Sequence, residues 1–81
     1  MRFVDTSYWV ALRLRRDANH EDAVRLWSPG QALLTTNHVV GETWTFLRRR
    51  GGHGSALAFL DAVGTLQEAG RLTVHRVTAH Q

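Results

Sequence analysis

The sequence predicts an α/β fold with a small parallel sheet, in the order β-α-α-β-α-α-β. Three short, mainly apolar runs, residues 2–4, 32–35 and 72–77, read as strands, and each is separated from the next by two segments with helical spacing. Strands separated by helical pairs favour parallel pairing through right-handed crossovers. With 81 residues, 43% of them hydrophobic, the chain is long enough for one small domain with its own core, which we place over residues 1–81.

The first pair of helical segments follows the first strand. Residues 6–16 are expected to form one helix, whose last turn gathers arginines. A loop at residues 17–19 separates it from a second helix at residues 20–27, where apolar side chains recur every three or four positions. The Ser-Pro-Gly sequence at residues 28–30 then ends that helix before the second strand.

The second pair is marked by residues that begin and end helices. Asn37 is a good N-cap for a third helix, which is expected to end near Gly51 and Gly52. Ser55 is the expected N-cap of a fourth helix, and Gly70 ends it. The expected buried stripe of this fourth helix comprises Ala56, Phe59, Leu60, Val63 and Leu66.

A carboxylate stands at the end of the first strand. Asp5 directly follows the apolar residues Phe3 and Val4, and an unpaired carboxylate is costly to bury unless a cation or a proton compensates it. Its simplest role is that of a helix N-cap, worth about 1 kcal/mol. Ligands also bind at the carboxyl ends of strands in open α/β sheets, so Asp5 can serve both purposes.

Glu42 is the expected partner of Asp5. It lies in the helix after the second strand, on one face with Val39 and Phe46, and parallel neighbouring strands would bring it to the same sheet edge as Asp5. Two carboxylates repel each other unless a cation lies between them. Oxygen-only ligands suit Mg²⁺ or Mn²⁺, which bind through a few carboxylates together with water and substrate phosphate.

The segments F-V-D-T-S-Y-W and T-N-H-V-V-G-E-T-W, with their separation, closely resemble PIN-domain ribonucleases, specifically VapC-type bacterial toxins of type II toxin–antitoxin systems. The resemblance implies a PIN-like three-layer fold and a cytoplasmic endoribonuclease that depends on Mg²⁺ or Mn²⁺. It also implies inhibition by a VapB-type antitoxin and, usually, a homodimer. By that resemblance Asp5 and Glu42 are the catalytic, metal-binding acids, and Thr6 and Ser7 give polar support.

The family also supplies further acidic ligands and strands from segments beyond those matched here. Residues 78–81 look like the first turn of another helix, so we expect a C-terminally truncated domain. Asp61 and Glu68 are poor substitutes for the later acids, because their spacing puts them on the side of the fourth helix away from its apolar stripe. The expected nuclease activity of the chain alone is therefore weak or absent.

The charge pattern is compatible with RNA as a substrate. All ten basic residues are arginine, which forks onto phosphates, and the net charge is +3. The run Arg48, Arg49 and Arg50 could grip phosphates or simply form a solvated helix end. No stretch approaches the roughly 18 apolar residues of a membrane span, so no membrane partner is expected.

Two other functions remain open from the sequence. The chain could be a non-catalytic interaction remnant that binds an antitoxin or another subunit, since a sheet that lacks its later strands leaves an open edge. It could also be a basic RNA-binding module, in which case binding would depend strongly on salt and would survive loss of the Asp5 carboxylate.

Overall fold

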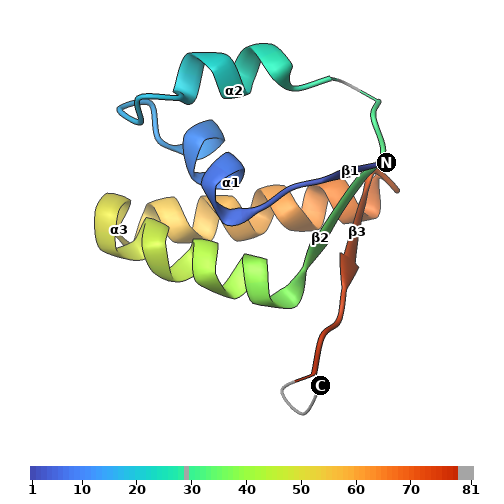
Figure 1. Cartoon of the computed structure of the whole chain (residues 1–81). Helices are drawn as coiled ribbons and strands as arrows, with labels where there is room; N and C mark the ends of the chain where they lie inside the picture. The colour runs from blue at the N-terminus through green and yellow to red at the C-terminus, as the bar shows by residue number, and fades with distance from the viewer. Residues whose placement is uncertain (29, 79–81) are drawn as a thin grey trace.

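The computed structural model describes residues 1–28 and 30–78, which form an α/β fold with one parallel sheet (Figure 1). This confirms the predicted fold class. The elements in chain order are β1 (Arg2–Phe3), α1 (Thr6–Arg13), α2 (His20–Leu26), β2 (Leu33–Thr36), α3 (Asn37–Glu68) and β3 (Leu72–His75).

The three strands lie side by side in the order β1-β2-β3, and both pairings are parallel. Phe3 is in register with Leu34, and Leu34 with Thr73. Residues 2–4 are mainly apolar, but only part of this run is buried: Phe3 is 52% exposed, whereas Val4, just after the strand, is fully buried. Successive side chains of an extended chain point to opposite sides, so only one of the two reaches the core.

Helix α3 changes direction sharply at Gly52. This residue has φ 86° and ψ 176°, a backbone conformation that is essentially restricted to glycine. The two halves of α3 run back alongside each other in Figure 1, from the green half to the orange half. The break lies where the sequence predicts a boundary between two helices. Helical backbone resumes directly after Gly52, so Ser55 lies inside the second half and is not the N-cap that the sequence predicts.

Two helix boundaries differ from the prediction. Thr36, and not Asn37, is the N-cap of α3: its backbone is extended, and its hydroxyl accepts a hydrogen bond from the amide of Val39 at 3.1 Å. Asn37 instead binds both backbone groups of Val77, at 2.7 and 3.1 Å, and ties the chain after β3 to the start of α3. Helix α1 ends at Arg13, three residues early, because Leu14 adopts an extended backbone.

The hydrophobic core lies where α1, both halves of α3 and the sheet meet. Trp9 is 2% exposed, and its ring packs edge-on against Phe59, with the ring centroids 5.4 Å apart. Of the expected stripe on the second half of α3, Ala56, Phe59 and Val63 are buried, Leu66 is partly buried, and Leu60 is 39% exposed. The buried core cluster comprises Val4, Trp9, Val10, Leu33, Leu47, Phe59, Val63 and Leu72.

The last predicted element, a helix beginning at residues 78–81, falls largely outside the described residues. The expected third strand is shorter than predicted and ends at His75. Within residues 1–28 and 30–78, no helix is both long and apolar enough to cross a membrane.

Candidate metal centre

The ends of β1 and β2 are held together by hydrogen bonds that place Asp5 beside the start of α3. The amide of Val4 donates to the carbonyl oxygen of Leu34 at 2.8 Å. The hydroxyl of Thr35, which is fully buried, donates to the carbonyl oxygen of Val4 at 2.9 Å. Because α3 begins at the next residue after β2, these bonds bring the first turns of α1 and α3 to one edge of the sheet.

Asp5 is the N-cap of α1. Its Oδ1 accepts hydrogen bonds from the amide of Tyr8 at 3.0 Å and from the hydroxyl of Ser7 at 2.9 Å. Its Oδ2 accepts no hydrogen bond from the residues that the structure describes. The simple capping role is therefore present, and it leaves one exposed carboxylate oxygen for another ligand.

Glu42 is exposed on the second turn of α3 and lines a depression of about 380 Å³. Thr6, the residue that directly follows Asp5, lines the same depression. Within residues 1–28 and 30–78, Glu42 forms no salt bridge. The structure thus brings the region of Asp5 and the Glu42 carboxylate to one hollow, which is lined by Thr6, Gly41, Glu42, Thr45, Phe46 and Arg49.

The two hydroxyl residues of the sequence motif have different surroundings. Ser7 donates its hydrogen bond to Asp5 Oδ1, which restrains the orientation of that carboxylate. Thr6 is half-buried and lines the hollow beside Glu42. Both residues are therefore close to the acids that the sequence singles out.

Glu42 at this hollow and Asp5, which directly precedes its lining residue Thr6, have the chemistry of magnesium or manganese ligands, but the set is small. Both candidate ligands are carboxylates, and hard divalent cations prefer such oxygen donors and retain several waters. In the described part of the chain, no group of three or more His, Cys, Asp or Glu side chains could hold a metal ion. Asp61 and Glu68 are exposed on the second half of α3 and join no such group.

Two features around the acids were not predicted: the position of Arg49, already a candidate phosphate-binding residue, beside Glu42, and a buried hydrogen bond between the strands. Arg49 lines the same depression as Glu42, and the signal was available, because the two residues are seven positions apart and so share one helix face. The buried hydrogen bond from Thr35 to Val4 had no such signal, since it depends on the pairing of two strands 31 residues apart.

The sequence matches the PIN domain family over residues 2–80. It is 56% identical over 59 residues to the 23S rRNA-specific endonuclease VapC20 of Mycobacterium tuberculosis, in the CDC 1551 and H37Rv strains alike. That match covers 72% of this chain and 45% of the relative. The crystal structure of M. tuberculosis VapC20, described as a sarcin–ricin loop cleaving toxin, superposes with a TM-score of 0.81 and 43% identity, over 99% of this chain and 59% of that one.

Proposed function

Because this chain belongs to the PIN domain family, we propose that it forms the metal-binding part of a VapC-type endoribonuclease that acts on RNA in the cytoplasm. The observation that supports this most is the shared edge of the sheet, where Asp5 begins α1 and Glu42 faces the hollow beside Thr6. The chain spans 45% of the length of the curated relatives, so the activity of a whole protein is part of the proposal.

In this proposal Asp5 and Glu42 hold Mg²⁺ or Mn²⁺. An ion held by these two carboxylates would supply an activated water for attack on phosphorus and would offset charge on the scissile phosphate. Ser7 and the amide of Tyr8 fix Oδ1 of Asp5, so that Oδ2 is presented to the ion. Arg49, on the rim of the same hollow, adds positive charge where the RNA phosphate would lie.

The proposed substrate is ribosomal RNA. The matched relatives are named as 23S rRNA-specific endonucleases, and the identity to them is high enough to make the same class of RNA the first to test. With only two carboxylate ligands in the described residues, cleavage by this chain alone should be slow, because Mg²⁺ dehydrates reluctantly and needs near-octahedral coordination.

We also propose that the chain binds a VapB-type antitoxin and that it forms a homodimer. The specific observation in favour is an apolar groove of about 430 Å³ between α1, α2 and the second half of α3, whose lining includes Trp9, Leu12, Val24, Trp27 and Leu66. Val24 is 52% exposed in it, and exposed apolar surfaces of this kind suit protein partners. The second candidate function, a non-catalytic interaction protein, rests on this groove.

Cleavage of a labelled 23S rRNA stem-loop in Mn²⁺ tests the proposal. We expect slow cleavage by the 81-residue chain that stops with EDTA and is lost in Asp5→Asn and Glu42→Gln. Asp61→Asn is the matched control, since it removes an exposed acid from the same helix as Glu42 without touching the hollow. Cleavage that persists unchanged in Asp5→Asn would refute the assigned site.

Two other outcomes separate the candidate functions. Fast cleavage that Asp5→Asn abolishes would support the site and contradict the expectation of slow activity. Failure to cleave any RNA, combined with no response to Mn²⁺ in thermal unfolding, would leave the interaction protein as the better proposal.

A further inference from the structure

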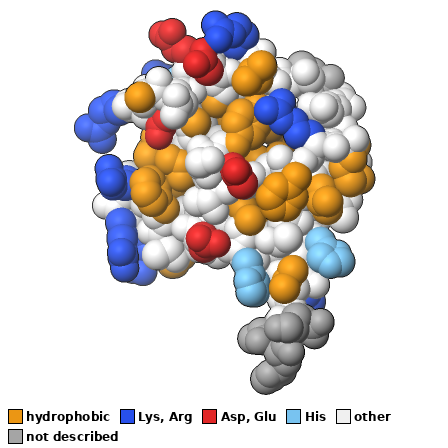
Figure 2. Space-filling model, viewed as in Figure 1, with side chains coloured by type: hydrophobic (Ala, Val, Ile, Leu, Met, Phe, Trp, Pro, Cys, Tyr) orange, Lys and Arg blue, Asp and Glu red, His pale blue; other side chains and the backbone are white. Residues whose placement is uncertain are grey.

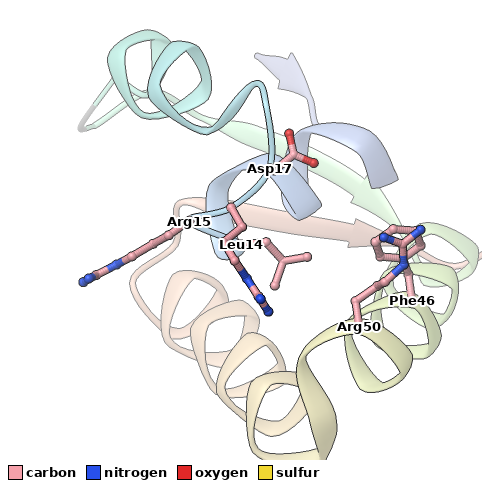
Figure 3. A pocket seen from close by; sticks show the side chains of 6 residues that line it. Leu14, Arg15, Asp17, Phe46 and Arg50 are labelled. Atoms are coloured by element: carbon pink, nitrogen blue, oxygen red, sulfur yellow. The ribbon is translucent and has the colours of Figure 1, made fainter.

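A second hollow, rich in arginine, lies between the connection after α1 and the first half of α3 (Figure 3). It has a volume of about 410 Å³. In Figure 3, Arg50 and Phe46 lie on the α3 side, and Arg15 projects outward from the opposite wall. Its lining residues, called the arginine cleft below, are Leu14, Arg15, Arg16, Asp17, Phe46 and Arg50.

The arginines of the arginine cleft form no salt bridge with a carboxylate among residues 1–28 and 30–78, although Asp17 also lines the cleft. In the described part of the chain, the salt bridge present is that between Arg25 and Asp22, on α2. Asp17 accepts a hydrogen bond from the amide of Asn19 at 2.8 Å. The Arg50 guanidinium lies over the ring of Phe46, 5.1 Å from its centroid.

Helix-end electrostatics do not explain Arg15 and Arg16 well. The favourable effect of a cation on a helix C-terminus is confined to the last turn. Because α1 ends at Arg13, both Arg15 and Arg16 lie beyond it. Figure 2 shows basic side chains gathered along the left edge of the molecule, the side where Figure 1 places the α1–α2 connection and the bend of α3.

The arginine cleft is adjacent to the hollow beside Glu42. Phe46 lines both hollows, and so forms their common wall. Glu42, Phe46 and Arg50 follow one another at intervals of four residues, which places them along one face of α3. Eight residues of helix span about 12 Å, the length of roughly three to four nucleotides of a stacked strand that rises roughly 3.4 Å per nucleotide.

We propose that the arginine cleft binds the phosphates of the RNA strand that flanks the cleavage point, through the guanidinium groups of Arg15, Arg16 and Arg50. The strand passes over Phe46 from the cleft into the hollow beside Glu42. Arginine suits this role because its fork of donors matches a phosphate group. The position of the cleavage point rests on the proposed function. RNA binding by the arginine cleft is independent of it.

Fluorescence anisotropy of a labelled single-stranded RNA, in EDTA and over a range of NaCl concentrations, tests this. We expect Arg50→Gln, and the double variant Arg15→Gln/Arg16→Gln, to weaken binding at least about threefold at low salt. The slope of log K against log salt should fall by about 0.7 for each phosphate of a single strand that the variant no longer neutralises. Circular dichroism of each variant checks that the fold is retained.

Arg25→Gln is the matched control, because it removes the same charge from an arginine that is paired with Asp22 and lies on α2. An equal loss of affinity in this control would show that net charge alone explains the weaker binding, and would overturn the proposal. Unchanged affinity in the cleft variants would also overturn it. Displacement of the RNA by polyglutamate at equal charge concentration would identify an acidic polypeptide as the ligand instead, and would contradict RNA.

The same assay separates this inference from the proposed function. Asp5→Asn and Glu42→Gln should bind RNA in EDTA at least as tightly as the unchanged chain, because each removes a negative charge near the path of the strand. If titration with Mn²⁺ shows no metal site while the arginine variants still lose affinity for RNA in EDTA, the cleft remains an RNA site and only the cleavage proposal fails.

Discussion

The hydroxyl of Thr35 donates a buried hydrogen bond to the carbonyl oxygen of Val4, and this bond joins the two strand ends from which the candidate site is built. Val4 is followed by Asp5, the N-cap of α1, and Thr35 by Thr36, the N-cap of α3. The relative position of Asp5 and Glu42 therefore depends on a hydrogen bond that involves neither acid.

Replacement of Thr35 by valine should destabilise the protein. Valine has nearly the same shape but no donor, so the buried Val4 carbonyl loses this partner at a cost of about 1–3 kcal/mol in the free energy of unfolding. Urea unfolding followed by circular dichroism measures the change. Thr73→Val, at an exposed position of β3, should change stability by less than about 0.5 kcal/mol, and an equal loss there would refute the role of the hydrogen bond.

Substitution of Gly52 by alanine should also destabilise the protein, although an added Cβ would meet no atom within 4 Å. The cost arises from the backbone, because φ 86° with ψ 176° is strained by about 1–3 kcal/mol for residues other than glycine. Gly64→Ala makes the opposite prediction. Its Cβ also meets nothing, its φ is not positive, and a helix interior gains about 0.5–1 kcal/mol from this change. Thermal melts of both variants check the contrast, which equal shifts would contradict.

The two roles of Asp5 can be separated by two substitutions. Asp5→Ala removes the acceptor for the Tyr8 amide and should cost about 1 kcal/mol of stability. Asp5→Asn keeps an oxygen that can cap the helix, so the protein should stay within a few tenths of a kcal/mol of its original stability. Chemical denaturation without added metal gives both values. Equal destabilisation by the two substitutions would show that the charge of Asp5, and not its capping bond, stabilises α1.

The sequence was sufficient to predict the parallel sheet, because local patterns of residues mark its strands and the helices between them. The helix break at Gly51 and Gly52 could be located for the same reason, since glycine pairs end helices. The N-cap of α3 was predicted one residue too late, because Asn and Thr are both good N-caps. The Asn37 side chain instead forms hydrogen bonds with the backbone of Val77, in the segment after β3, which the sequence does not reveal.

For the site, the types of residue were more predictable than their surroundings. Asp5 and Glu42 stand out as acids placed near strand ends, and the structure brings the turn after Asp5 to the hollow beside Glu42. The arginine cleft could not be foreseen, because it joins the segment after α1 to α3 across about 30 residues of chain. Its form depends on α1 ending at Arg13, whereas the arginine-rich sequence favours a longer helix.

Titration of the 81-residue chain with Mn²⁺, followed by calorimetry, tests most directly whether Asp5 and Glu42 share one divalent ion. We predict a saturable isotherm that Asp5→Asn and Glu42→Gln each weaken at least about tenfold, while Asp61→Asn leaves it unchanged. An isotherm that is the same for all four proteins, or no saturable heat from the unsubstituted chain, would contradict a metal site at this edge of the sheet.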